Sequence, residues 1–321
     1  MIKYNSSILC PLCGESVNKI LTTELRRGSG NVYFCEDCQH GFHIPKNDFD
    51  AKKYYAENYR QEYSHNAEEA ATNAREIFDV YRHYQSDRIN IISPYLTGAS
   101  ELLEVGASSG QFLINIKDRL ARVNAIELDK TCCDFMRTEL GIFADSELLR
   151  ESVFANEIYD VVCSFQVMEH VANPLEFIND LSQSTKDRGV IFIEVPNLHD
   201  SLLSIWNIDA YKKFFYHSAH LHYFTEDSLR KLAMRAGFLA EQIEIKFIQD
   251  YNVLNHLSWI MNGAPQSTCK IGLDKIDFFS SNQDISKWMT ERIGELNKDY
   301  ITKLINVKAT SNMMLVLKNE K

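Results

Sequence analysis

Four of the eight cysteines in this chain of 321 residues form two closely spaced pairs near the N-terminus. Each pair has two residues between its cysteines, so a single tight turn can present both sulfurs to one metal ion. Two such turns supply the tetrahedral set of four thiolates that structural zinc sites use. Unligated reduced cysteines would not account for two matched pairs. The sequence therefore predicts a structural zinc site with the ligands Cys10, Cys13, Cys35 and Cys38.

The segment that carries these cysteines is too short to bury much apolar surface, so the metal would supply its folding free energy. It contains few runs typical of strands, and Pro45 is followed by a polar pair that marks its end. We expect a small zinc-ribbon-like module, poor in strands, over residues 1–48. A helical linker or lid is expected over residues 49–97.

A turn of small residues lies between an apolar strand over 102–105 and an expected helix over 111–120. Small side chains let a ligand approach the backbone, and the start of a helix offers free N–H groups. The next strand ends at Glu127, whose carboxylate can accept hydrogen bonds from both hydroxyls of a ribose. A dinucleotide fingerprint needs glycine at two positions where this chain has serine and glutamine, which argues against NAD or FAD.

This loop resembles the cofactor motif of class I S-adenosylmethionine-dependent methyltransferases, acidic-x-Gly-x-Gly-x-Gly. Glu104, Gly106 and Gly110 are in place, and Ser108 departs from the motif. Later segments resemble the same family in the same order, over residues 159–171, 173–175, 189–197 and 220–238. By this resemblance, S-adenosylmethionine would contact Glu104, Gly106, Ala107, Ser108 and Gly110 in the loop, Glu127 at the ribose, Leu128 beside the adenine, and Phe165 and Gln166 beside the methionine moiety.

Short apolar runs alternate with helical stretches from Glu101 onward, which is typical of a parallel sheet covered on both faces. With the family resemblance, this pattern predicts an α/β fold: a Rossmann-like seven-stranded methyltransferase sheet over 98–321. A mostly helical insertion is expected at about 250–306, and one amphipathic helix over 74–92. The strands expected from the pattern cover residues 102–105, 123–126, 159–164, 190–195, 240–247 and 312–317.

Methyl transfer to a hydroxyl or a carbon acid needs a group that takes the proton, and histidine is suited to this near neutral pH. The candidates are His170, His217, His220 and His222. His220 is favoured because it lies where the acceptor should bind. A structural role for this histidine-rich stretch is the alternative. The four-cysteine module joined to such a core is also similar to methyltransferases of nucleotide-linked sugars. Their C-methylating members have a Glu-His pair where this chain has Ala219 and His220, which leaves O- or N-methylation open.

The tyrosine-rich segment before residue 64 is a further candidate on the acceptor side, with packing between domains as the alternative; it contains Tyr54, Tyr55, Tyr59 and Tyr63.

The net charge of −10 argues against long nucleic acids and anionic membranes as partners, because both are bound mainly by lysine and arginine. We expect a small-molecule acceptor, in the first place a sugar or nucleotide sugar. RNA methylation assisted by zinc and a non-catalytic binding role are the alternatives. The N-terminus lacks the apolar stretch of a signal peptide and no apolar run is long enough for a membrane span, so a cytoplasmic location is expected.

Overall fold

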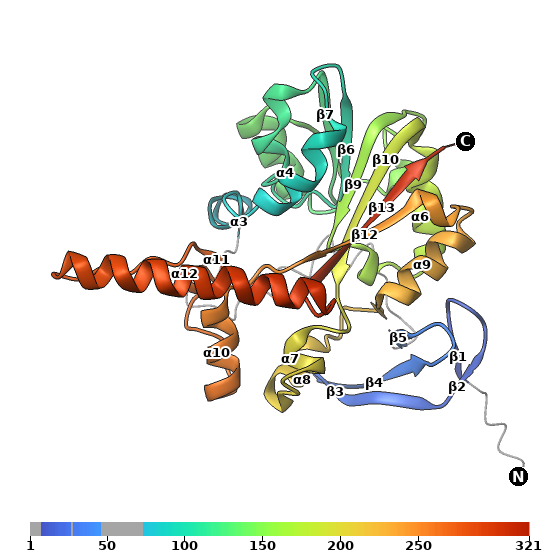
Figure 1. Ribbon diagram of the computed structural model, residues 1–321. Helices are drawn as coiled ribbons and strands as arrows, with labels where there is room; N and C mark the ends of the chain where they lie inside the picture. Colours follow the sequence, from blue (N-terminus) through green and yellow to red (C-terminus); the bar gives the residue numbers. More distant parts are fainter. Residues whose placement is uncertain (1–7, 27, 46–72, 321) are drawn as a thin grey trace, which may run out of the picture.

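The computed structural model describes residues 8–26, 28–45 and 73–320 (Figure 1). Its main element is a seven-stranded sheet with the strand order β12-β13-β10-β9-β6-β7-β8. The strands of this sheet are β6 (Glu101–Val105), β7 (Arg122–Ile126), β8 (Phe143–Asp145), β9 (Tyr159–Phe165), β10 (Thr185–Pro196), β12 (Ile243–Ile248) and β13 (Asn312–Asn319). The predicted seven-stranded sheet is confirmed, and β8 is the strand that the sequence pattern did not reveal.

Adjacent strands from β10 to β8 run parallel, whereas β13 lies antiparallel between β10 and β12. Starting from β6, the chain first adds β7 and β8 on one side of this strand and then β9 and β10 on its other side. The strand order therefore reverses between β6 and β9, which are parallel hydrogen-bonded neighbours. In open α/β sheets, ligands bind outside the carboxyl ends of the strands at such a reversal. The fold therefore directs attention to the loops that follow β6 and β9.

Helices cover both faces of the sheet, as predicted (Figure 1). Alternate residues of each strand point to opposite faces, so Leu103 and Leu102 enter two different apolar clusters. One cluster contains residues of α6 and α9, and the other contains residues of α3, α4 and α5. These helices are α3 (Ala74–Tyr81), α4 (Ser86–Ile92), α5 (Lys130–Phe135), α6 (Pro174–Gln183) and α9 (Glu226–Arg235).

The N-terminal module is richer in strands than the sequence suggested. Its strands are β1 (Ile8–Leu9), β2 (Ser16–Val17), β3 (Lys19–Leu25), β4 (Gly28–Cys35) and β5 (His40–His43). The prediction of a module poor in strands is wrong, because its strands are short or polar and lack an apolar alternation. The last strand, β5, pairs antiparallel with β11 (His222–Tyr223) of the core that contains the seven-stranded sheet. The module and the core therefore share one four-stranded sheet.

Two predicted helices differ from the structure. The helix expected over 74–92 is broken after Arg82, which separates α3 from α4. The helix expected over 111–120 consists instead of two short 3₁₀ turns. There the side-chain amide of Asn115 donates to the carbonyl of Gln111 at 2.8 Å and so takes the acceptor that an α-helix would use.

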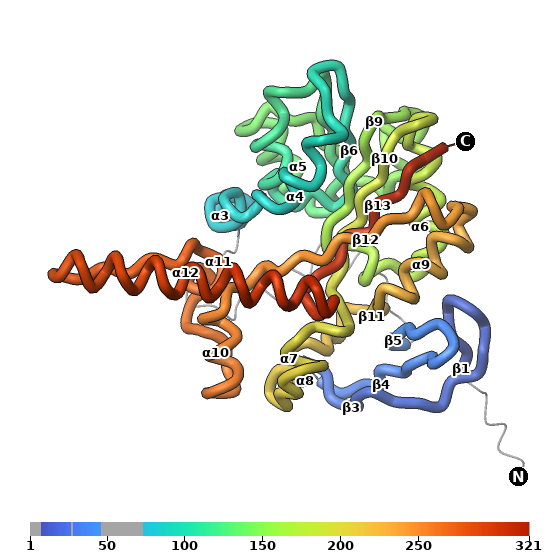
Figure 2. The backbone as a smooth tube through the Cα atoms, viewed as in Figure 1, coloured from blue at the N-terminus to red at the C-terminus, as the bar shows by residue number. Residues whose placement is uncertain are grey.

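The insertion over 250–306 is mostly helical, as predicted. It contains α10 (Val253–Asn262), α11 (Cys269–Leu273) and the long helix α12 (Gln283–Asn306). α12 extends well away from the sheet before the chain returns through β13 (Figures 1 and 2). Two shorter helices, α7 (Ser201–Ser204) and α8 (Asp209–Phe215), lie beside the N-terminal module, where α8 packs against β3 (Figure 1).

Among the residues that the structure describes, no helix has both the length and the apolar character needed to cross a bilayer.

Candidate functional site

The loop after β6 is held against the end of β7 by backbone hydrogen bonds. The N–H groups of Gly106 and Ala107 both donate to the carbonyl of Ile126, at 2.7 and 3.0 Å. Gly106, Ser108 and Gly110 all have positive φ angles, so the backbone changes direction sharply within this short loop. The predicted glycines thus occupy positions where a side chain would be strained.

Glu127 lies at the carboxyl end of β7 and fixes this loop. Its two carboxylate oxygens accept from the N–H groups of Ser108 at 2.7 Å and Asp129 at 3.0 Å. The side chain is only partly buried, so its carboxylate can reach a ligand beside the loop. Leu128 follows it and is also partly buried. The structure thus brings together the loop and the carboxylate that the sequence assigned to one cofactor.

Glu104 is the acidic residue of the loop motif, and it is 3% exposed at the end of β6. One of its carboxylate oxygens, Oε2, has no hydrogen-bond partner among the described residues. Burial raises the pKa of this carboxyl to about 8, because desolvation penalises the charged form. A buried acceptor of this kind needs a donor, and the ammonium group of a methionine moiety supplies one. These residues therefore fit S-adenosylmethionine.

Gly106 allows the loop to approach the segment after β9. A Cβ atom at this position would lie 2.3 Å from Cγ2 of Val167, and its φ angle is +83°. We expect Gly106→Ala to lower the free energy of unfolding by more than about 1 kcal/mol and to weaken S-adenosylmethionine binding, because strain and a clash act together. Gly141→Ala is the matched control, since Gly141 has a φ of +64° and open space around its Cβ. Calorimetry with the cofactor and thermal unfolding check this; equal cofactor affinity in both variants would contradict it.

An ion pair that the sequence did not reveal lies beside the predicted cofactor residues. The guanidinium of Arg88 donates to both carboxylate oxygens of Glu194, at 2.9 and 2.5 Å. The side-chain amide of Gln166 donates to the same carboxylate at 3.0 Å, and Arg88 also lies 4.5 Å from the ring centre of Phe165. Glu194 is 1% exposed, so this bidentate pair fixes both residues in one geometry. The sequence feature that could have revealed this ion pair is Glu194 itself, an acidic residue within the apolar run of β10.

Asp250 continues this polar group on the other side of Glu194. Desolvation of its carboxyl group and the nearby carboxylate of Glu194 raise its pKa, although the residue as a whole is exposed. Its Oδ2 accepts from the side-chain amide of Asn312 at 2.5 Å. The predicted methionine side of the cofactor site is therefore bordered by the hydrogen-bonded group of Arg88, Glu194 and Gln166, and Asp250 lies near it.

Glu169 was not among the predicted residues, but it lies in one cluster with two of them, His170 and His220. His170 and His220 lie with ring centres 4.7 Å apart, and His217 packs against His220 at the same distance. Burial lowers the pKa of His170 to about 4 and that of His220 well below its usual value. Burial also raises the pKa of Glu169 to about 8. The structure thus brings His170 and His220 together.

His222 lies elsewhere. It is on β11, 3% exposed, and its Nδ1 lies 3.0 Å from Nε2 of His40 on the neighbouring strand β5. Its pKa is lowered to about 4 by burial. His222 therefore joins the N-terminal module to the core, and its position gives no support to the predicted catalytic role. The tyrosines at 54, 55, 59 and 63 lie outside the described residues.

The four predicted zinc ligands form one cluster, in which all four sulfurs lie within 4.8 Å of one another. Cys38 lies 3.1 Å from Cys13 and 3.4 Å from Cys35, and its third sulfur neighbour, Cys10, is at 3.5 Å. Sulfurs about 2.3 Å from a tetrahedral zinc ion would be separated by about 3.8 Å, close to these values. The cluster fits a zinc ion.

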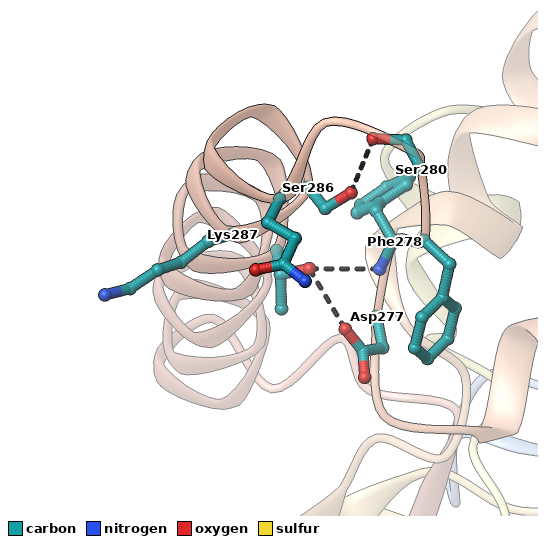
Figure 3. Close-up of a pocket in the computed structure, with 8 residues that line it drawn as sticks. Asp277, Phe278, Ser280, Ser286 and Lys287 are labelled. Atoms are coloured by element: carbon teal, nitrogen blue, oxygen red, sulfur yellow. Dashed lines mark hydrogen bonds between the residues drawn. The ribbon is translucent and has the colours of Figure 1, made fainter.

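A shallow pocket at the start of α12 is separate from this site. It is formed entirely by the loop before α12 and the first turns of that helix (Figure 3). The hydroxyls of Ser280 and Ser286 lie 2.7 Å apart across it, and the N–H of Phe278 donates to Thr290 at 3.0 Å. These contacts connect the loop to the helix, and no strand of the main sheet contributes to the pocket.

The family model of the methyltransferase domain matches residues 55–243, which is more than half of the chain. The chain belongs to this family. No curated protein shows significant sequence similarity to it.

Solved structures of S-adenosylmethionine-dependent methyltransferases have the same fold. Phosphoethanolamine N-methyltransferase 2 of Haemonchus contortus, in complex with S-adenosyl-L-methionine, is 12% identical; the match covers 93% of this chain and 71% of that chain with a TM-score of 0.50. A methyltransferase of Archaeoglobus fulgidus is 18% identical over 76% of this chain and 97% of that chain, with a TM-score of 0.47. At these identities the likeness concerns the fold.

Proposed function

We propose that this protein transfers a methyl group from S-adenosylmethionine to a small acceptor, in the first place an oxygen or nitrogen of a sugar or nucleotide-linked sugar. The observation that carries the proposal is the cluster of Glu169, His170 and His220, because Glu169 and His170 follow Val167, against which Gly106 of the cofactor loop packs. The net charge of −10 supports a small acceptor over a long nucleic acid.

The residues on the cofactor side would bind S-adenosylmethionine and orient its methyl group. In this proposal, Glu127 holds the ribose hydroxyls, Glu104 accepts from the ammonium group, and the loop over 106–110 supplies a backbone surface. Phe165 and Gln166, fixed by the Arg88–Glu194 pair, border the methionine moiety. The bound cofactor supplies an activated methyl group, so positioning carries much of the catalysis.

In this proposal, the acceptor binds where the N-terminal module meets the core. Arg26, at the end of β3, stacks 3.8 Å above the ring of Phe214, and its N–H donates to the carbonyl of Tyr216 at 2.6 Å. Tyr216 directly precedes the segment 217–220 that carries His220, so Arg26 is held next to that segment. A cation close to His220 suits the phosphates of a nucleotide sugar. The module would then help to form the acceptor site.

The test is transfer of a labelled methyl group from S-adenosylmethionine, with nucleotide sugars and purified RNA offered in parallel. Label in the nucleotide-sugar fraction is expected. Label in RNA alone would contradict the proposed acceptor. Absence of cofactor binding by calorimetry would instead favour a non-catalytic role.

We expect His220→Ala to reduce turnover at least about 100-fold while S-adenosylmethionine affinity stays within about threefold, because the residue acts on the acceptor and not on the cofactor. His83→Ala removes an exposed imidazole on a different part of the chain and serves as the control. Single-turnover kinetics and calorimetry on both variants check this. Turnover near that of the unaltered protein would remove His220 from the reaction.

A further inference from the structure

Glu169, His170 and His220 present three metal-ligating atoms to one point, all within 4.8 Å of one another. Glu169 and His170 belong to a short 3₁₀ turn after β9, and His220 comes from the loop before β11. The backbone N–H of Leu221 donates to the carbonyl of Glu169 at 2.8 Å and holds these two segments together. The cluster is thus built from two elements of the core that are fixed to each other.

The carboxylate of Glu169 is the strongest sign that a cation belongs here. The residue is 1% exposed, and neither of its carboxylate oxygens has a hydrogen-bond partner among the described residues. Buried carboxylates are normally paired, hydrogen-bonded or bound to a metal, because an isolated one costs several kcal/mol. Nε2 of His170 is its nearest charged-group neighbour at 3.8 Å, which is too long for a hydrogen bond.

The orientation of His170 points to the same conclusion. Its Nδ1 lies 3.0 Å from the carbonyl of Ala219, and a carbonyl only accepts, so the proton is on Nδ1. The lone pair of Nε2 then faces the carboxyl group of Glu169 at 3.8 Å, without a hydrogen bond between them. A histidine that binds a metal commonly donates its other N–H to a carbonyl in this way. Nδ1 of His220 is buried and has no partner among the described residues either.

We propose that Glu169, His170 and His220 bind a divalent first-row transition-metal ion such as manganese or zinc. Two imidazoles and one carboxylate suit these ions, whereas magnesium and calcium prefer oxygen ligands alone. Three protein ligands leave coordination positions open, in contrast to the four cysteines of the N-terminal module. Cis ligands of such an ion lie about 3 Å apart, so the side chains would close in by small rotations.

The chemical role of this ion rests on the proposed function, although its binding does not. An open position on this ion would take an oxygen or nitrogen of the acceptor and lower the pKa of its proton. That proton would pass to a solvent water as the methyl group moves from the sulfonium sulfur to the acceptor and S-adenosylhomocysteine leaves. His220 would then promote the reaction as a ligand. This ion would favour acceptors in which an oxygen or nitrogen atom receives the methyl group, because a carbon atom at that position could not bind the metal.

Manganese is the probe, because thiolate sites select softer metals and the cysteine cluster should retain zinc. The protein is dialysed to one zinc ion per chain, and Mn²⁺ is titrated while the electron paramagnetic resonance signal of the free ion is followed. We expect one Mn²⁺ per chain in the unaltered protein and in His83→Asn. Glu169→Gln and His220→Ala should weaken binding at least about 100-fold, since even partners of metal ligands contribute 10- to 100-fold.

Cofactor calorimetry on each variant shows that the core is folded. The proposal is overturned if the folded protein binds no metal beyond the single zinc. In that case the carboxyl group of Glu169 would be neutralised by a proton and not by a metal ion. It is also overturned if both variants bind Mn²⁺ like the unaltered protein. Mn²⁺ binding without methyl transfer to any sugar would contradict the proposed acceptor and leave the metal site standing.

Discussion

Replacing Glu127 with alanine is expected to weaken S-adenosylmethionine binding about 100-fold, since two hydrogen bonds to a carboxylate contribute about 1.5 kcal/mol each. The same carboxylate accepts from the N–H groups of Ser108 and Asp129, so its loss also loosens the cofactor loop. The loop is still held by Gly106 and Ala107 through the carbonyl of Ile126. The fold should therefore survive, with a change in thermal midpoint of only a few degrees.

Isothermal titration calorimetry with S-adenosylmethionine measures this effect directly. Glu127→Gln keeps one acceptor oxygen and should lose less affinity than the alanine variant. Glu139→Ala is a suitable control, because Glu139 is an exposed acid paired with Arg75 on the helical layer. Unchanged affinity in Glu127→Ala would remove this residue from the cofactor site.

The sequence could predict that the small-residue loop and Glu127 lie together, because their positions depend on local features. Residues 102–110 carry a strand, a turn and its special backbone angles within nine positions, and Glu127 follows at the end of the next strand. Parallel neighbours place their carboxyl ends together, so the sheet order alone brings Glu127 to the loop. The four cysteines were predictable for the same reason, since each pair is contained in one turn.

The Arg88–Glu194 pair could not be predicted in this way. Its two members are 106 residues apart, and Arg88 reaches the sheet only because the expected helix over 74–92 breaks before α4. The spacing of apolar residues over 74–92 is that of one continuous helix, so it does not predict the break. The strand β8 was missed because three residues are too few to show an alternation.

The histidine-rich stretch before α9 contains neighbouring residues that lie in different places. His220 and His222 are two residues apart, and only His220 lies with Glu169 and His170. His222 belongs to a strand, and its partner His40 comes from a module 182 residues away. Strand pairing across that distance decides which histidine faces the site, and one sequence does not contain this information.

Loss of the proposed zinc ion is expected to disturb the proposed acceptor side and to spare the proposed cofactor side. The N–H of His43 donates to the carbonyl of Leu221 at 2.9 Å, next to His220 in the chain. The hydroxyl of Thr225 donates to the carbonyl of Gln39 at 2.8 Å, directly after the second cysteine pair. Among the described residues, these contacts join the module to the loop before α9 and not to the loop over 106–110.

Cys35→Ser should therefore reduce methyl transfer at least about 10-fold and unfold the module, because zinc would supply much of its folding free energy. Affinity for S-adenosylmethionine should stay within about threefold. Hydrogen exchange supplies a readout independent of activity: amides over 217–225 should exchange faster, and those of β9 and β10 should not. Cys269→Ser is the control, since this cysteine lies on α11, outside the cluster. Equal exchange over 217–225 in both variants would mean that the zinc module does not order the histidine loop.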